Sequence, residues 1–266
     1  MSKIEYDFIV SLGADCACTR YLRKSNLQKE SYPFDWLTNA ASSEGSLGGR
    51  FDLILNDFEG FMNLEDLKSL PKDSEMFNNK NFDYYENTRN GLYYFHEFPK
   101  GVEPQGIWPE VRSKYQRRIK RFYQMIQEND KVLFVWFAHR PNISDEKIIE
   151  YSDKINSKFG KKIDIIIFEN NKDYPISDKF DTVKLTHSIT KYILNTYPDG
   201  ITDKTRGNVK LCNQVFKLYS LNESFSEVFA RKSGRVTREI KRVLFKFMRL
   251  VNPRFKSPDP QSLFKL

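Results

Sequence analysis

Apolar runs along the chain alternate with polar stretches, as is typical of a protein that alternates strands with helices. Two of these runs, 132–138 and 163–168, are continuous and predict strands covered on both faces of a sheet. Residues 145–159 between them carry acids in the first turn, apolar residues at helical spacing and a closing Gly160. This order of strand, helix and strand predicts that the two strands pair in parallel.

A similar unit opens the chain. The β-rich run 8–12 stops at Gly13, and a helix-permissive stretch, 16–24, follows it. Weaker patterns predict strands at 92–98 and 182–185, a helix at 111–127, and surface loops at 42–49 and 71–85. We therefore expect a single α/β domain over residues 5–215, with a mainly parallel sheet flanked by helices. Residues 216–266 are expected to form a helical, basic C-terminal segment.

The positive charge of the chain is concentrated near its C-terminus. The net charge is +8, but residues 231–256 hold ten Lys or Arg and one acid, so the remainder is close to neutral. Apolar residues in this segment recur at helical spacing, with the basic residues largely on the other side. We expect this basic amphipathic helix to bind an anionic membrane surface. The alternative is a helix that packs its apolar face on the domain, and nucleic acid is a disfavoured partner because the domain itself is not basic.

Composition and the first residues bear on class and location. A hydrophobic fraction of 39% excludes a disordered chain. The longest apolar run, 132–138, is far shorter than the roughly 20 residues of a membrane-spanning helix. The N-terminus lacks the pattern of a secretory signal. We therefore expect a cytoplasmic protein, with the basic segment available for peripheral attachment to the inner face of the membrane.

The chain has three cysteines, Cys16, Cys18 and Cys212. They are too few and too irregularly spaced for a disulfide framework or a four-ligand zinc site, so no metal is expected. Cys16 would begin the helix after Gly13, at the edge of an α/β sheet where ligands bind. Unpaired amides and the helix dipole there lower the pKa of a thiol, and the amides from Asp15 to Ala17 offer donors to an oxyanion. The charge of Asp15 opposes ionisation of the thiol unless its side chain caps the helix.

An alternative interpretation is structural: Asp15 caps an ordinary helix and Cys16 fills space as a small hydrophobic residue. A nucleophile also requires a base, and the chain has three histidines, His96, His139 and His187. His96 lies in an aromatic-rich predicted strand, and His139 directly follows another strand. Asp35 is the candidate third member of a triad, or alternatively the cap of a helix that starts at Trp36.

Three basic residues, Arg117, Arg118 and Arg121, lie on the polar face of the predicted helix 111–127. They form either a solvated surface or an anion site for a phosphate-bearing sugar donor or coenzyme. The chain contains no glycine-rich nucleotide loop, no His-Glu-x-x-His and no Gly-x-Ser-x-Gly. Nucleotide-dependent, zinc-peptidase and serine-hydrolase mechanisms are therefore disfavoured.

Several blocks of the sequence resemble a known family. The opening block runs from Ile9 to Cys16 and continues through Ser31–Trp36, and later blocks are 95–98, 117–122 and 132–135. Together they resemble a bacterial family described as papain-like cysteine peptidases. The resemblance implies a catalytic Cys16 and His96 with Asp35 as the acidic partner. This chain has Glu97 where the family usually has an Asp shortly after the histidine. The strand, Gly turn and Cys are also similar, more weakly, to capsule-biosynthesis acetyltransferases that bind coenzyme A.

These features give two hypotheses of different class. In the first, Cys16 transfers an acyl group from a small-molecule, saccharide or peptide substrate, with His96 as base. Water as acceptor makes the protein a hydrolase, whereas a sugar hydroxyl makes it an acyltransferase of surface-polysaccharide biosynthesis that could use coenzyme A. In the second hypothesis, Cys16 is structural and the protein is a non-enzymatic, membrane-associated accessory protein.

Overall fold

The structure is a computed structural model that describes residues 3–13, 15–39, 47–71, 79–138, 143–171, 179–195, 208–223 and Ser233. The chain divides into two units, Met1–Leu221 and Asn222–Leu266. All the helices and strands described here belong to the first unit. The predicted basic helix, 231–256, falls outside the described residues apart from Ser233.

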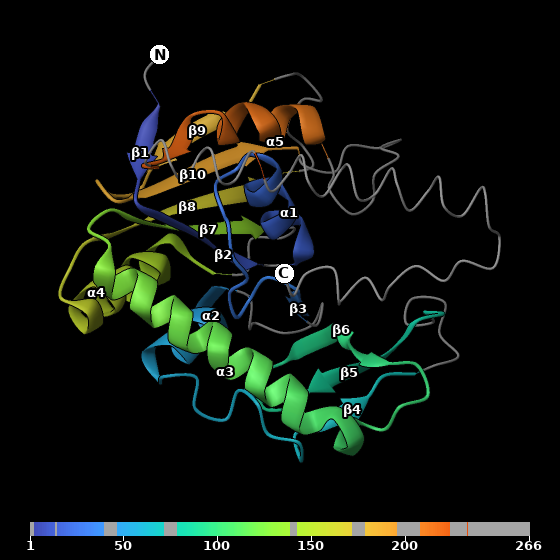
Figure 1. Ribbon diagram of the computed structural model, residues 1–266. Helices are drawn as coiled ribbons and strands as arrows, with labels where there is room; N and C mark the ends of the chain where they lie inside the picture. The colour runs from blue at the N-terminus through green and yellow to red at the C-terminus, as the bar shows by residue number, and fades with distance from the viewer. Residues whose placement is uncertain are drawn as a thin grey trace. The chain divides into compact units, whose positions relative to one another are not determined.

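A five-stranded sheet forms the centre of the first unit (Figure 1). Its strands, in spatial order, are β2 (Phe8–Gly13), β7 (Val132–Ala138), β8 (Ile163–Asn170), β10 (Ile189–Leu194) and β9 (Asp181–Lys184). The first four strands pair in parallel, and β9 joins the edge antiparallel. The predicted α/β class with a mainly parallel sheet flanked by helices is confirmed.

Helices cover both faces of this sheet. One face is covered by α1 (Cys16–Lys24) and α5 (Val209–Phe216), and the other by α2 (Leu47–Leu55), α3 (Pro104–Glu128) and α4 (Asp145–Phe159). Successive strand residues point to opposite faces, so Leu133 and Val135 pack in the α1–α5 core while Phe134 and Trp136 pack in the other. Burial on both faces explains why β7 is a continuous apolar run.

The unit β7–α4–β8 and the pair β2–α1 form as the pattern predicts. In α4 the cap is Ser144, whose side chain accepts from the Lys147 amide, and Gly160 ends the helix at a φ of 63°. Both helices span the predicted residues, because local signals define their ends.

A second, antiparallel sheet has the order β3 (Leu37–Asn39), β6 (Leu92–Pro99), β5 (Phe82–Asn87) and β4 (Leu67–Ser69). The predicted strand 92–98 therefore forms, but it pairs with β5 and β3 rather than with the parallel sheet. A further pair, β1 (Ile4–Tyr6) with β11 (Tyr219–Leu221), is parallel. The first unit therefore contains an antiparallel sheet and a separate two-stranded pair in addition to the predicted, mainly parallel sheet.

Three local predictions are wrong in part. Residues 82–85, predicted as loop, are the start of β5, whose alternate side chains are buried. The predicted loop 42–49 ends early, because α2 begins at Leu47, where Gly48 leaves room for the ring of Tyr151. No helix starts at Trp36, since residues 33–36 form a turn that leads into β3.

Candidate functional site

Cys16 is the first residue of α1 and follows the carboxyl end of β2. The chain turns sharply between them, and Gly13 adopts a φ of +115° that L side chains rarely tolerate. Asp15 is the helix cap, and one of its carboxylate oxygens accepts from the Ala17 amide at 2.6 Å. The amide of Ala17, a predicted oxyanion donor, is thus engaged by Asp15.

The surroundings of Cys16 favour a protonated thiol at rest. Burial raises the pKa of Cys16, and the charge of Asp15 raises it further. The Arg20 charge and the helix-terminal amide of Cys16 lower it by less. The predicted lowering of this pKa by the helix end is therefore outweighed. Cys16 is nevertheless half-buried, whereas Cys18 and Cys212 are fully buried.

His96 lies in a bulge of β6. Tyr94 of β6 pairs with Tyr85 of β5 and Phe98 pairs with Asp83, so three residues of β6 lie opposite one residue of β5. The bulge breaks the alternation of the strand: Glu97 and Phe98 are both buried and His96 is exposed. Bulges often redirect a side chain beside an active site.

Aromatic rings and positive charges surround the imidazole of His96. The rings of Trp36 and Phe82 meet it edge-on, at centroid distances of 6.1 Å and 5.9 Å. Partial burial lowers the pKa of His96, and the charges of Arg20 and Lys114 lower it further. The imidazole is therefore neutral at neutral pH and able to accept a proton.

One face of α1 connects Cys16 to the neighbourhood of His96. Residues three and four apart on a helix share a face, and Cys16, Arg20 and Arg23 follow that spacing. Arg20 acts electrostatically on both Cys16 and His96. Arg23 lies 5.4 Å from the ring centroid of Trp36, the ring that also contacts His96. Arg20 and the Arg23–Trp36 contact thus link the start of α1 with the bulge of β6.

Asp35 has a structural role in this region. Its side chain is completely buried and accepts hydrogen bonds from Gln28 Nε2 at 2.8 Å, the Tyr32 amide at 3.0 Å and Thr19 Oγ1 at 3.2 Å. Among the described residues, none of its hydrogen bonds reaches His96. Asp35 therefore holds its loop against α1. The prediction that Asp35 orients His96 has no support in these hydrogen bonds.

Glu97 does not orient His96 either. It is buried on the other side of β6, where it pairs with Lys114 and accepts from the hydroxyl of Tyr115 at 2.8 Å. Of the other histidines, His139 lies outside the described residues, and His187 is exposed in the turn between β9 and β10.

The three arginines of α3 point to different partners. Arg121 donates to Glu30 at 3.0 Å, Arg118 lies over the ring of Tyr115, and Arg117 donates to Ser113 at 2.8 Å. The anion site stays a prediction from the sequence. Across the described residues no three His, Cys, Asp or Glu side chains gather as a metal site, and no helix there combines the length and apolarity needed to cross a membrane.

Sequence reasoning missed Arg50, a completely buried residue of α2. Its guanidinium lies 4.8 Å from the ring centroid of Phe34 and 5.9 Å from that of Trp136, and burial lowers its pKa to about 9. It packs against Gly13 and interacts electrostatically with Asp15. The available signal was an arginine in the largely apolar segment of α2, where Asp52 is the other charged residue.

A cysteine at the start of a helix beside an α/β sheet and a neutral histidine are the residue types that thiol-dependent acyl chemistry uses. A family model described as “Putative papain-like cysteine peptidase (DUF1796)” matches residues 7–168, and the chain belongs to this family. The “Uncharacterized protein R408” of Acanthamoeba polyphaga mimivirus is 26% identical over 200 residues, which cover 70% of this chain and 87% of that protein. No solved structure matches the chain significantly.

Proposed function

We propose that this protein is a cysteine-dependent hydrolase in which Cys16 is the nucleophile and His96 the general base. The observation that carries the proposal is the shared environment of the two side chains. The Arg20 charge lowers the pKa of both Cys16 and His96. The ring of Trp36, which contacts His96, also lies under the guanidinium of Arg23, a further residue of α1. Membership of a family described as papain-like cysteine peptidases supports the same chemistry.

The proposed reaction has two steps. His96 takes the proton of the Cys16 thiol as sulfur attacks the carbonyl carbon, and the imidazolium then protonates the leaving group, which departs to leave a thioester. Water, deprotonated by His96, attacks the thioester, and its proton passes back to the thiol. We assign the helix-terminal amide of Cys16, which interacts with its own thiol, as donor to the developing oxyanion.

In the resting enzyme the Cys16 thiol and the His96 imidazole are both uncharged. The pKa of the thiol is raised and that of the imidazole is lowered, so both shifts oppose a preformed thiolate–imidazolium pair. Proton transfer therefore accompanies attack, and the enzyme requires a base at His96 rather than a standing thiolate.

The acyl acceptor distinguishes two versions of this function. The family description favours water and an amide substrate. Transfer to a saccharide hydroxyl, with an acyl-coenzyme A thioester as donor and coenzyme A as leaving group, uses the same first step and remains our expectation from sequence for surface-polysaccharide synthesis. A nitrophenyl ester assayed with and without added saccharide separates them, because only a transferase forms the saccharide ester.

The test is hydrolysis of a nitrophenyl ester and labelling by iodoacetamide at neutral pH. Cys16→Ala is expected to abolish ester turnover and labelling, while Cys212→Ser, which alters a buried thiol, leaves both unchanged. His96→Ala is expected to slow turnover by about 100-fold or more, while His187→Ala, which alters an exposed histidine, has no effect. If His96→Ala and His187→Ala behave alike, His96 is not the base. Equal turnover by Cys16→Ala supports the accessory-protein alternative.

A further inference from the structure

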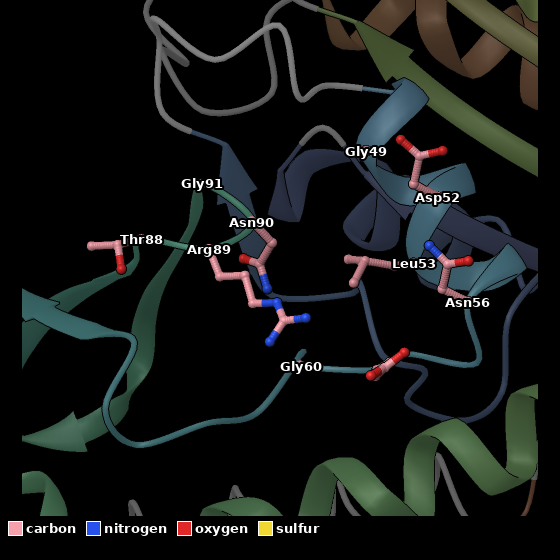
Figure 2. Close-up of a pocket in the computed structure, with 10 residues that line it drawn as sticks. Gly49, Asp52, Leu53, Asn56, Gly60, Thr88, Arg89, Asn90 and Gly91 are labelled. Atoms are coloured by element: carbon pink, nitrogen blue, oxygen red, sulfur yellow. The ribbon is translucent and has the colours of Figure 1, made fainter.

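We propose that a cavity lined by neither Cys16 nor His96 binds a small zwitterion of amino-acid or dipeptide type. The cavity measures about 510 Å³, within the range of ligand pockets, and lies between α2 with its following turn and the turn that joins β5 to β6 (Figure 2). Its lining residues include Asp52, Asn56, Glu59, Arg89 and Asn90. Neither Cys16 nor His96 lines it, so the proposal is independent of the hydrolase function.

The two walls are fixed before any ligand arrives. Asn87 is completely buried, and its side-chain carbonyl accepts from the amides of Arg89 and Asn90 at 3.0 Å and 3.2 Å. Its amide nitrogen donates at 3.3 Å to the carbonyl of Phe61, in the turn that follows α2. Gly91 closes the turn at a φ of +66°. A preformed cavity does not pay an ordering cost on binding.

One wall offers hydrogen-bond donors. Within the described part of the chain, the Arg89 guanidinium makes no hydrogen bond or ion pair, and it lies over Gly60, where an added Cβ would come within 2.5 Å of it. The Nδ2 atom of Asn90 is shielded from solvent and has no partner, while its Oδ1 accepts from Leu92. A shielded donor without a partner is costly, so Asn90 Nδ2 calls for an acceptor, and the exposed Arg89 guanidinium of the same wall is suited to a carboxylate.

The opposite wall offers acceptors. Figure 2 shows Asp52 on α2, and Asn56 directly after this helix, across the cavity from Arg89 and Asn90. The Asp52 carboxylate accepts from the Tyr151 hydroxyl at 3.1 Å, which holds it in place. Glu59, in the turn that follows α2, adds a second carboxylate. This wall suits an ammonium group.

Charge balance selects the zwitterion. The lining carries two carboxylates and one guanidinium, so a simple anion is repelled by the α2 wall. A simple cation leaves Arg89 and Asn90 without an acceptor. A ligand with both a carboxylate and an ammonium satisfies both walls.

The test is saturation-transfer NMR on the full chain with the twenty free amino acids and diglycine. At least one is expected to bind with a Kd below about 10 mM, and its N-acetyl and amide derivatives to bind at least about tenfold more weakly. If none of the 21 compounds binds, or if both blocked derivatives bind as well as the parent, the proposal is wrong.

Variants assign the walls. Arg89→Ala and the isosteric Asn90→Asp, which replaces the Nδ2 group and its two N–H donors by a carboxylate oxygen, are each expected to weaken binding by about tenfold or more, and Asp52→Asn by a smaller factor. Arg112→Ala, an exposed arginine of α3, is the control and leaves binding unchanged. Circular dichroism checks folding. Binding that survives Arg89→Ala and Asn90→Asp contradicts the proposed site, whereas unchanged ester turnover in these variants leaves the hydrolase proposal intact.

Discussion

Gly13 and Arg50 are in contact at the turn that precedes Cys16: a Cβ added to Gly13 would lie 3.1 Å from the Nη2 atom of Arg50 and 3.3 Å from the Trp136 ring. The turn thus requires glycine twice, once for its φ of +115° and once for the space that the guanidinium occupies. Because Asp15 and Cys16 follow this turn, the contact between Gly13 and Arg50 bears on the position of the Cys16 thiol.

Gly13→Ala is expected to lower the free energy of unfolding by about 2–4 kcal/mol, since backbone strain and crowding of a buried arginine add. Urea denaturation measures it. Gly101→Ala is the matched control: Gly101 also has a positive φ, +76°, but nothing lies within 4 Å of its Cβ position. An equal loss in both variants would mean that Arg50 does not constrain Gly13.

Asp15→Asn is expected to lower the pKa of Cys16. The Asp15 charge raises this pKa, second only to burial, whereas the Arg20 charge and the Cys16 amide lower it by less. Removing the carboxylate charge therefore favours the thiolate.

The pH profile of Cys16 alkylation measures the effect. A profile that Asp15→Asn leaves unchanged would mean that the Asp15 charge does not act on the thiol. In the intact chain the alkylation rate should keep rising beyond pH 9, the ordinary thiol pKa, while Cys18 and Cys212, with pKa values of about 12, stay unlabelled.

Asp35→Ala is expected to cost about 2–4 kcal/mol of stability, because it strands the buried donors of Gln28, Tyr32 and Thr19. Asp35→Asn tests the charge. Burial raises the folded-state pKa of Asp35 above its ordinary 3.8, so the native state holds the proton more tightly than the unfolded chain. The Asp35 contribution to stability is therefore present below pH 3.8 and falls as the pH rises through the folded pKa.

Urea unfolding at pH 4 and pH 7 checks the sign: relative to wild type, Asp35→Asn should gain stability at the higher pH. His96-dependent ester turnover should persist in Asp35→Asn if the residue only fastens its loop. Loss of turnover in a stably folded Asp35→Asn protein would restore Asp35 as the partner of His96.

The sequence of residues 231–256 predicts salt-dependent binding to anionic membranes, and the proposal rests on that sequence alone. Each basic residue near such a surface contributes on the order of 1 kcal/mol, and salt screens the attraction. The intact chain should sediment with vesicles rich in acidic lipid at low salt, and a chain truncated after Phe229 should not. Unfolding of the truncated chain would instead indicate that the segment packs on the domain.

Local signals in the sequence were sufficient for β2–α1 and for β7–α4–β8. Caps at Asp15 and Ser144, the stop at Gly160 and the continuous apolar strands act within a few residues, so their effect can be read from the chain. The same locality placed Cys16 at the start of a helix.

Only the tertiary structure decided how distant groups meet. The pairing of β6 with β5, and the bulge that exposes His96, depend on a register between two strands that no local pattern encodes. The sequence suggested Asp35 as a triad member, but its carboxylate oxygens accept hydrogen bonds from the side chains of Gln28 and Thr19. Arg50 is buried because Phe34, Trp136 and Gly13 enclose it. The sequence by itself determined the elements and the thiol, whereas long-range packing determined which charges surround that thiol, because pKa values follow burial and neighbours in space rather than in sequence.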